Sequence, residues 1–208
     1  MRLHSPVAVA AIAAAVLCVA PVLSGQETKD DAADAARLVD VLAIHTGSTV
    51  ADIGAGSGGL AQRIAQTVGR EGRVYATEVN TQRLGDLRNL ARGTDPNIVV
   101  VEGAAAQSNL PDGCCDAIYM RHVYHHFGEP GPMNASLYRA LKPGGKLAVI
   151  DFTPKTGKSA PAGQRASGDA HGVMQQTVID ELSAAGFTNT HAAEWPASGS
   201  FLVVGERP

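Results

Sequence analysis

Short apolar runs and amphipathic segments alternate along most of the chain. Runs rich in valine, isoleucine and alanine predict strands, and they lie at 49–53, 73–77, 98–101, 114–120 and 147–152. Apolar positions three or four residues apart predict helices, and these cover 31–44, 60–68, 81–91, 132–140 and 173–185. The run 98–101 is entirely β-branched, which predicts a strand buried on both faces. Strands that alternate with helices are typical of an α/β fold.

The last third of the chain departs from this alternation. Residues 153–172 are rich in Gly, Ala, Ser, Pro and Lys. A loop of this length inside a compact domain is usually a lid or a binding loop. Residues 188–194 and 200–205 then predict two strands that form a closing antiparallel hairpin.

The first 25 residues have a pattern of their own. Arg2 and His4 precede an apolar run from Val7 to Val19, and small residues follow at 24–25. This arrangement predicts a secretory signal peptide over 1–25, a polar linker over 26–33 and one domain over 34–208. Cleavage would make the protein periplasmic or secreted. The alternative is an uncleaved segment that anchors the protein, and only this alternative predicts contact with a membrane.

Composition and charge narrow the classes of partner. The 208 residues are 45% hydrophobic, enough to build the core of one globular domain. The 17 basic and 20 acidic residues give a net charge of −3 and are mixed along the chain. Without a basic block, nucleic acid is not an expected partner. Nothing in the sequence indicates an oligomeric state.

A glycine-rich turn joins the first predicted strand to a predicted helix. It contains Asp52, Gly54, Gly56 and Gly59, an arrangement that brings backbone N–H groups up to a ligand. The glycine spacing satisfies the dinucleotide fingerprint, with Glu78 as a candidate ribose ligand at the end of the second strand. However, the Asp52 carboxylate would repel a pyrophosphate. It suits a ligand with a cationic amino-acid end and no phosphate.

Three segments resemble class I S-adenosylmethionine-dependent methyltransferases. Residues 52–58, Asp-x-Gly-x-Gly-x-Gly, resemble motif I of that superfamily, and residues 121–127 resemble motif IV of its small-molecule members. The Leu-Lys-Pro-Gly-Gly turn at 141–145 is similar to the turn that follows in the same superfamily. The resemblance covers residues 34–206. It implies a Rossmann-like α/β fold: a seven-stranded, mostly parallel sheet with helices on both faces and a C-terminal antiparallel hairpin.

The resemblance also implies S-adenosylmethionine as the cofactor. Family members commonly carry an acid just after Gly103 that accepts a hydrogen bond from adenine, and Ala104 stands there in this chain. Gln107, Ser108 or backbone groups would have to replace that contact, whose loss would weaken binding by about 1.5–3 kcal/mol. The implied cofactor residues are Asp52, Gly54, Ala55, Gly56, Gly58, Glu78, Ala104 and Arg121.

The segment after the fourth predicted strand carries the catalytic candidates. The resemblance to motif IV implies that His126, His125 and Tyr124 line the space between methyl donor and acceptor. A histidine can serve as the base where the nucleophile holds a proton, and His126 is the first candidate, followed by His125. The resemblance also puts His171 over the acceptor pocket. No metal site is predicted, because no acid or further histidine stands at ligand spacing beside these histidines.

Cys114 and Cys115 are the two cysteines of the predicted domain. A bridge between sequence neighbours is strained, so an ordinary structural disulfide is not predicted. We expect two small, buried apolar side chains at the entrance of the fourth strand.

These features together predict transfer of a methyl group from S-adenosylmethionine to a small molecule. The sequence does not indicate the acceptor, nor whether oxygen, nitrogen, carbon or sulfur is methylated. Two alternatives stay open: an exported, non-catalytic protein that keeps the fold as a binding module, and an NAD-dependent oxidoreductase. The first stays open because the predicted export separates the protein from a cofactor made in the cytosol.

Overall fold

The computed structural model describes residues 24–93, 97–196 and 199–208. Apart from its last two positions, the predicted signal peptide lies outside the described residues. Within those ranges no helix has both the length and the apolar character needed to cross a membrane.

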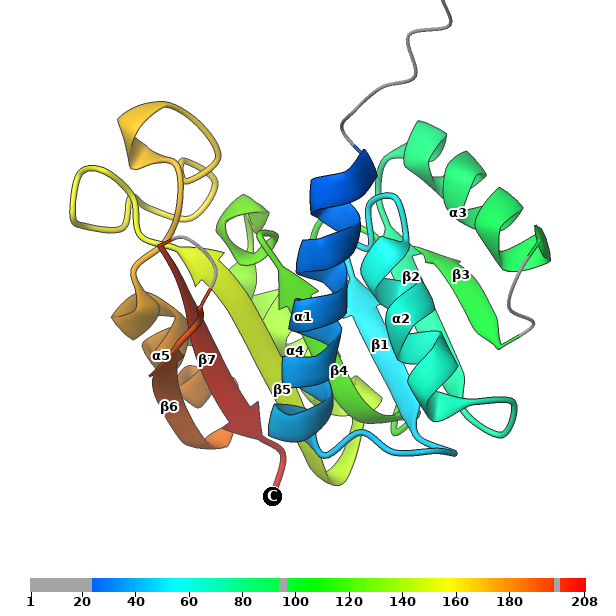
Figure 1. Cartoon of the computed structure of the whole chain (residues 1–208). Helices are drawn as coiled ribbons and strands as arrows, with labels where there is room; N and C mark the ends of the chain where they lie inside the picture. Colours follow the sequence, from blue (N-terminus) through cyan, green and yellow to red (C-terminus); the bar gives the residue numbers. More distant parts are fainter. Residues whose placement is uncertain (1–23, 94–96, 197–198) are drawn as a thin grey trace, which may run out of the picture.

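The strands of the described residues form one seven-stranded sheet in the order β3-β2-β1-β4-β5-β7-β6 (Figure 1). β1 to β5 pair in parallel, whereas β7 pairs antiparallel with β5 and with β6. The strands are β1 (Thr49–Ile53), β2 (Arg73–Glu78), β3 (Ile98–Glu102), β4 (Cys115–Arg121), β5 (Leu141–Phe152), β6 (Thr188–Glu194) and β7 (Ser200–Glu206). This arrangement confirms the predicted fold class.

Helices cover both faces of the sheet. They are α1 (Ser24–Leu42), α2 (Gly59–Val68), α3 (Thr81–Gly93), α4 (Pro130–Ala140) and α5 (Gln175–Ala184), with short 3-10 helices η1 (Tyr124–His126) and η2 (Gly168–Ala170). α1 and α2 lie side by side on one face (Figure 1). α1 begins at Ser24, so the positions predicted to form a linker are helical.

The central strands are buried on both faces, as parallel strands between two helical layers must be. In β4, Ala117 and Tyr119 belong to the core that also contains α1 and α2. The alternate residues Ile118 and Met120 belong to the core that contains α4 and α5. The sheet therefore separates two hydrophobic cores, and its carboxyl edge is left to bind ligands.

The prediction that residues 98–101 are fully buried is wrong. The side of β3 that carries Val99 faces out, and Val99 is 37% exposed. β3 is the edge strand beyond β2, so one layer of helices covers it incompletely. β-branched composition reports strand propensity but not position in the sheet.

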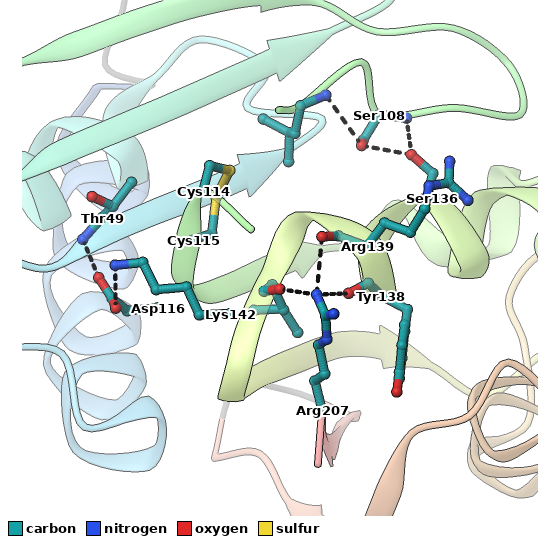
Figure 2. The surroundings of a disulfide bond; sticks show 12 residues. Thr49, Ser108, Cys114, Cys115, Asp116, Ser136, Tyr138, Arg139, Lys142 and Arg207 are labelled. Atoms are coloured by element: carbon teal, nitrogen blue, oxygen red, sulfur yellow. Dashed lines mark hydrogen bonds and ion pairs between the residues drawn. A yellow bond between two sulfur atoms is a disulfide. The ribbon is translucent and has the colours of Figure 1, made fainter. Parts of the chain in front are cut away.

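Cys114 and Cys115 are joined by a disulfide, which corrects the prediction of two unbridged side chains (Figure 2). Burial is as predicted for Cys115. The next residue, Asp116, accepts hydrogen bonds from the backbone N–H of Thr49 (2.8 Å) and from Nζ of Lys142 (2.6 Å). The carboxylate thus joins the start of β4 to β1 and β5.

Candidate functional site

A cavity of about 970 Å³ opens at the carboxyl ends of β1, β2 and β4. Its lining includes the glycine turn after β1, the end of β2, the segment after β3 and the segment after β4. Eight of the predicted site residues line it: Asp52, Gly54, Ala55, Gly56, Glu78, Ala104, Arg121 and His126. The other four, Gly58, Tyr124, His125 and His171, lie outside its lining.

The glycine turn is held against the end of β2. The backbone N–H of Ala55 donates to the carbonyl oxygen of Thr77 (2.8 Å), and that of Gly56 donates to Oε2 of Glu78 (3.2 Å). Gly56 has a φ of +58°, and a Cβ added there would meet open space. A side chain at Gly58 would instead lie 2.6 Å from Leu90. Gly56 therefore lines the cavity without a close neighbour at its Cβ position, whereas Gly58 allows α3 to pack closely.

Asp52 is a buried carboxylate at the end of β1. Its Oδ2 accepts a hydrogen bond from the Tyr119 hydroxyl (2.9 Å). Desolvation by burial raises the pKa of Asp52 to about 7, although the Tyr119 bond opposes that shift. The carboxylate is therefore poised near neutral pH, and a cation bound beside it would favour its ionised form.

Glu78 organises the chain around the end of β2. Its Oε1 accepts hydrogen bonds from the backbone N–H groups of Val79 (2.8 Å) and Asn80 (3.0 Å). With the bond from Gly56, three backbone donors converge on this carboxylate, which is 5% exposed. Glu78 thus fixes the glycine turn and presents its remaining acceptor capacity to the cavity.

Arg121 connects the end of β4 to α1. Its guanidinium donates to Asp31 (2.5 Å) and to Asp34 (2.6 Å), and Asp34 also accepts a bond from the Trp195 indole (3.1 Å). These partners could not be predicted from local sequence patterns, because they lie about 90 residues from Arg121 in the chain. The cluster holds α1 beside the cavity.

Tyr124 points into a buried network outside the cavity lining. Its hydroxyl donates to Glu181 (2.9 Å) and accepts from the Asn134 amide (2.8 Å). Burial, followed by the negative charge of Glu181, raises the pKa of Tyr124. Glu181 also pairs with Arg165 (2.7 Å) of the predicted lid. Through Glu181 this tyrosine is linked to the segment that carries Arg165, and its hydroxyl is not directed at the cavity.

The two histidines of η1 and His171 lie together. Nδ1 of His125 is 2.8 Å from Oδ1 of the buried Asp151, and Nε2 of His125 is 3.1 Å from Nε2 of His171. The ring of His126 lies 4.1 Å from that of His125. Desolvation, followed by the neighbouring histidines, lowers the pKa of His126. In the sequence, no acid or further histidine stands at ligand spacing beside residues 121–127. The fold brings Asp151 and His171 to that place.

Near Ala104, which stands where family members commonly have an acid, two residues are candidates to replace the contact of that acid with adenine. The Ser108 hydroxyl lies 2.9 Å from the Ser136 hydroxyl in a buried pair. Gln107 lines the cavity, and its backbone carbonyl oxygen accepts a hydrogen bond from the backbone N–H of Ala104 (2.9 Å). Both residues line the cavity, but the Ser108 hydroxyl is already engaged with Ser136, so Gln107 is the better candidate to contact a ligand there.

Comparison with known proteins points to one class. Residues 51–149 match a family model described as a methyltransferase domain. Over 112 residues the chain is 32% identical to the ubiquinone/menaquinone biosynthesis C-methyltransferase UbiE of Francisella tularensis, a match that covers 53% of this chain and 45% of that protein. The chain spans about half the length of the curated relatives it matches.

Solved structures agree on the fold. A SAM-dependent methyltransferase from Aquifex aeolicus superposes with a TM-score of 0.70 at 24% identity, covering 84% of this chain and 90% of that chain. Phosphoethanolamine N-methyltransferase 2 of Haemonchus contortus, in complex with S-adenosyl-L-methionine, gives 0.69 at 14% identity, covering 85% and 52%. The fold is that of the class I methyltransferases. The matching family model and the curated relatives are likewise described as methyltransferases.

Replacing Asp52 by asparagine should stabilise the protein more at pH 8 than at pH 5. The pKa of Asp52 is about 7 in the folded chain against an ordinary value of 3.8. Between these values the folded state holds a proton that the unfolded state has lost, so the free energy of unfolding falls as pH rises. Asparagine avoids this loss and can still accept the Tyr119 bond. Thermal denaturation at both pH values measures the difference.

Asp116→Asn is the matched control. Burial opposes ionisation of Asp116, but the bonds from Lys142 and Thr49 outweigh it and lower its pKa. This substitution should therefore lower the melting temperature at pH 8. An equal gain from Asp52→Asn at pH 5 and pH 8 would contradict the burial argument.

Proposed function

We propose that this protein transfers a methyl group from S-adenosylmethionine to a small-molecule acceptor. The observation that carries the proposal is a single cavity lined both by Asp52 with the open glycine turn and by His126. The first group suits the methyl donor, and the second suits an acceptor that must lose a proton.

The residues of the cavity fit the cofactor. The buried Asp52 carboxylate, with its pKa near 7, would pair with the ammonium group of the amino-acid end. Glu78 has about four acceptor sites and uses three for backbone donors, so it can accept from a ribose hydroxyl. Gln107 would contact the adenine in place of the missing acid. Arg121 would act indirectly, by holding α1 beside the site.

The main task of the protein in this reaction is to align the acceptor with the methyl group. The bound cofactor supplies an electrophilic methyl group, which an acceptor attacks in line. The walls of the cavity would hold the acceptor in that line and exclude water, which removes much of the entropic barrier. His126 would accept the proton of the attacking group, because it lines the cavity and its lowered pKa keeps it neutral at pH 7.

The size and lining of the cavity favour a small acceptor. A volume of about 970 Å³ is at the upper end of the range of roughly 300–1,000 Å³ for small-molecule sites. Phe127 and Met133 contribute apolar surface beside His126. The Francisella relative is named for ubiquinone and menaquinone biosynthesis. We therefore propose phenolic and quinol compounds as the first acceptors to test.

Gly56→Ala should weaken the binding of S-adenosylhomocysteine by at least about tenfold, equivalent to 1.4 kcal/mol. The added methyl group would project into the cavity that the ligand occupies. Gly113→Ala is the matched control, because Gly113 has a similar φ of +62°, also faces open space and is not among the residues of this cavity. Both variants bear the same left-handed strain of about 1–2 kcal/mol. Calorimetric titrations that give equal affinities for the two variants would rule out the glycine turn as the cofactor site.

His126→Ala should lower turnover by about a hundredfold, the usual contribution of a general acid or base. Cofactor affinity should stay within about threefold, less than the 1.4 kcal/mol of a tenfold change. Release of S-adenosylhomocysteine with a panel of phenols and quinols measures turnover, and titration measures affinity. His191→Ala, on exposed β6, should change neither. Equal losses of turnover and affinity in His126→Ala would exclude the acceptor role.

A further inference from the structure

The cluster of His125, His126 and His171 has the composition of a metal site. One ligand nitrogen from each of the three imidazoles can be chosen so that all lie within 4.8 Å of one another. η1 contributes two of the histidines, and the third follows η2, at the end of the predicted lid. The fold therefore assembles a ligand set that the sequence does not show as a local motif.

From this arrangement we propose that His125, His126 and His171 bind a divalent transition-metal ion. The inference goes beyond the proposed function and stands without it, because the ligand is an ion and not the cofactor. The two proposals share His126, which lines the cavity. While it binds an ion, His126 cannot also accept the acceptor's proton, so in the metal-bound protein the ion takes over that part of the chemistry.

Asp151 prepares His125 as a ligand. The carboxylate is fully buried and accepts bonds from Nδ1 of His125 (2.8 Å) and from the backbone N–H groups of His125 (3.1 Å) and Phe152 (2.8 Å). Nδ1 therefore carries the proton, and Nε2 presents its lone pair to His171. A carboxylate behind a ligating imidazole is the usual outer-shell partner in metal sites.

The charge balance around Asp151 favours a cation. In the part of the chain that the structure describes, its carboxylate pairs with His125 and with no lysine or arginine. A buried charge is costly unless it is paired. A metal ion on the far side of His125 would add positive charge behind the imidazole that Asp151 holds.

His171 is held in position by backbone contacts. The N–H of Val173 donates to the carbonyl oxygen of Phe152 (3.0 Å). Gly172 has a φ of +118°, and any Cβ there would lie 2.6 Å from that same oxygen. The Phe152 ring lies 4.9 Å from the His125 ring and 5.0 Å from the His171 ring. These contacts bring His171 to the end of β5 and limit the movement of both rings.

The spacing of the nitrogens suits a tetrahedral ion. Metal–nitrogen bonds of 2.0–2.1 Å place two ligands of a tetrahedral zinc about 3.3 Å apart. The Nε2 atoms of His125 and His171 are 3.1 Å apart. Without an ion, one Nε2–H bridges this pair. With an ion, His171 would carry its proton on Nδ1, and His126, which is exposed, would rotate to complete the set.

Three imidazole ligands select the class of ion. They suit zinc, copper, nickel or iron, whereas magnesium and calcium prefer oxygen ligands. Three protein ligands leave a position for water or substrate. Because His126 also lines the cavity, an ion here could bind the acceptor oxygen and favour its deprotonation. That last role rests on the proposed function, whereas binding of the ion does not.

Titration of zinc into the metal-stripped full-length protein, against a competing chromophoric chelator, tests the site. We expect one equivalent to bind to the wild type and cobalt to give the absorption spectrum of a tetrahedral site. His171→Ala should weaken zinc binding by at least about tenfold, the lower range for disturbing a metal site. His191→Ala is the control, since His191 lies on β6 with Nδ1 bonded to the carbonyl oxygen of Asn189, and it should bind zinc like the wild type.

Asp151→Asn should weaken zinc binding by about 10–100-fold, as loss of an outer-shell carboxylate does. If that buried substitution prevents folding, the exposed His171 variant still decides the question. No saturable zinc binding by the wild type, or equal affinity in the wild type, His171→Ala and His191→Ala, would overturn the site. Titration of S-adenosylhomocysteine into the same preparations reports on the cofactor pocket separately, so failure of either proposal is recognised by itself.

Discussion

The parallel pairing of β1 between β2 and β4 is the constraint on which the site depends. In this register Asp52 stands opposite Ala76 on β2 and Tyr119 on β4. The hydrogen bond from Tyr119 to Asp52 follows from that pairing, because opposite residues in parallel strands present their side chains to the same face. The same alignment brings the ends of the three strands to one edge, where Asp52, Glu78 and Arg121 line one cavity.

Three ionisable side chains near this edge differ in how their charge is balanced. Arg121 is neutralised by two carboxylates from α1. Asp151 receives three donors, including the ring of His125. Asp52 has one side-chain donor, and its pKa rises to about 7. A carboxylate that is costly to ionise in the free protein is suited to pair with a cationic ligand. Asp52 has the fewest hydrogen-bonding partners of the three, and it is the residue that we assign to the cofactor.

Most of the fold could be predicted from the sequence because its signals are local. Apolar runs and the glycine turn predict the strands and the ligand loop, although β5 begins at Leu141, so the predicted turn at 141–145 is part of the strand. Position within the sheet is not local, which is why the exposure of Val99 on the edge strand was missed. Partners distant in the chain were missed for the same reason. The contact between His125 and His171, which are 46 residues apart, depends on the path of residues 153–172 and on the backbone conformation of Gly172. Residue spacing in the sequence does not predict such a contact.

The most direct test of the central claim is titration of S-adenosylhomocysteine into the full-length protein at pH 6 and at pH 8. With a pKa of about 7 for Asp52, the ionised fraction rises from about one tenth to about nine tenths over this range. We therefore predict that affinity is about tenfold higher at pH 8 than at pH 6 and that binding releases a proton. This difference in affinity between the two pH values should disappear in Asp52→Asn. An affinity that is independent of pH and unchanged in Asp52→Asn would contradict this prediction.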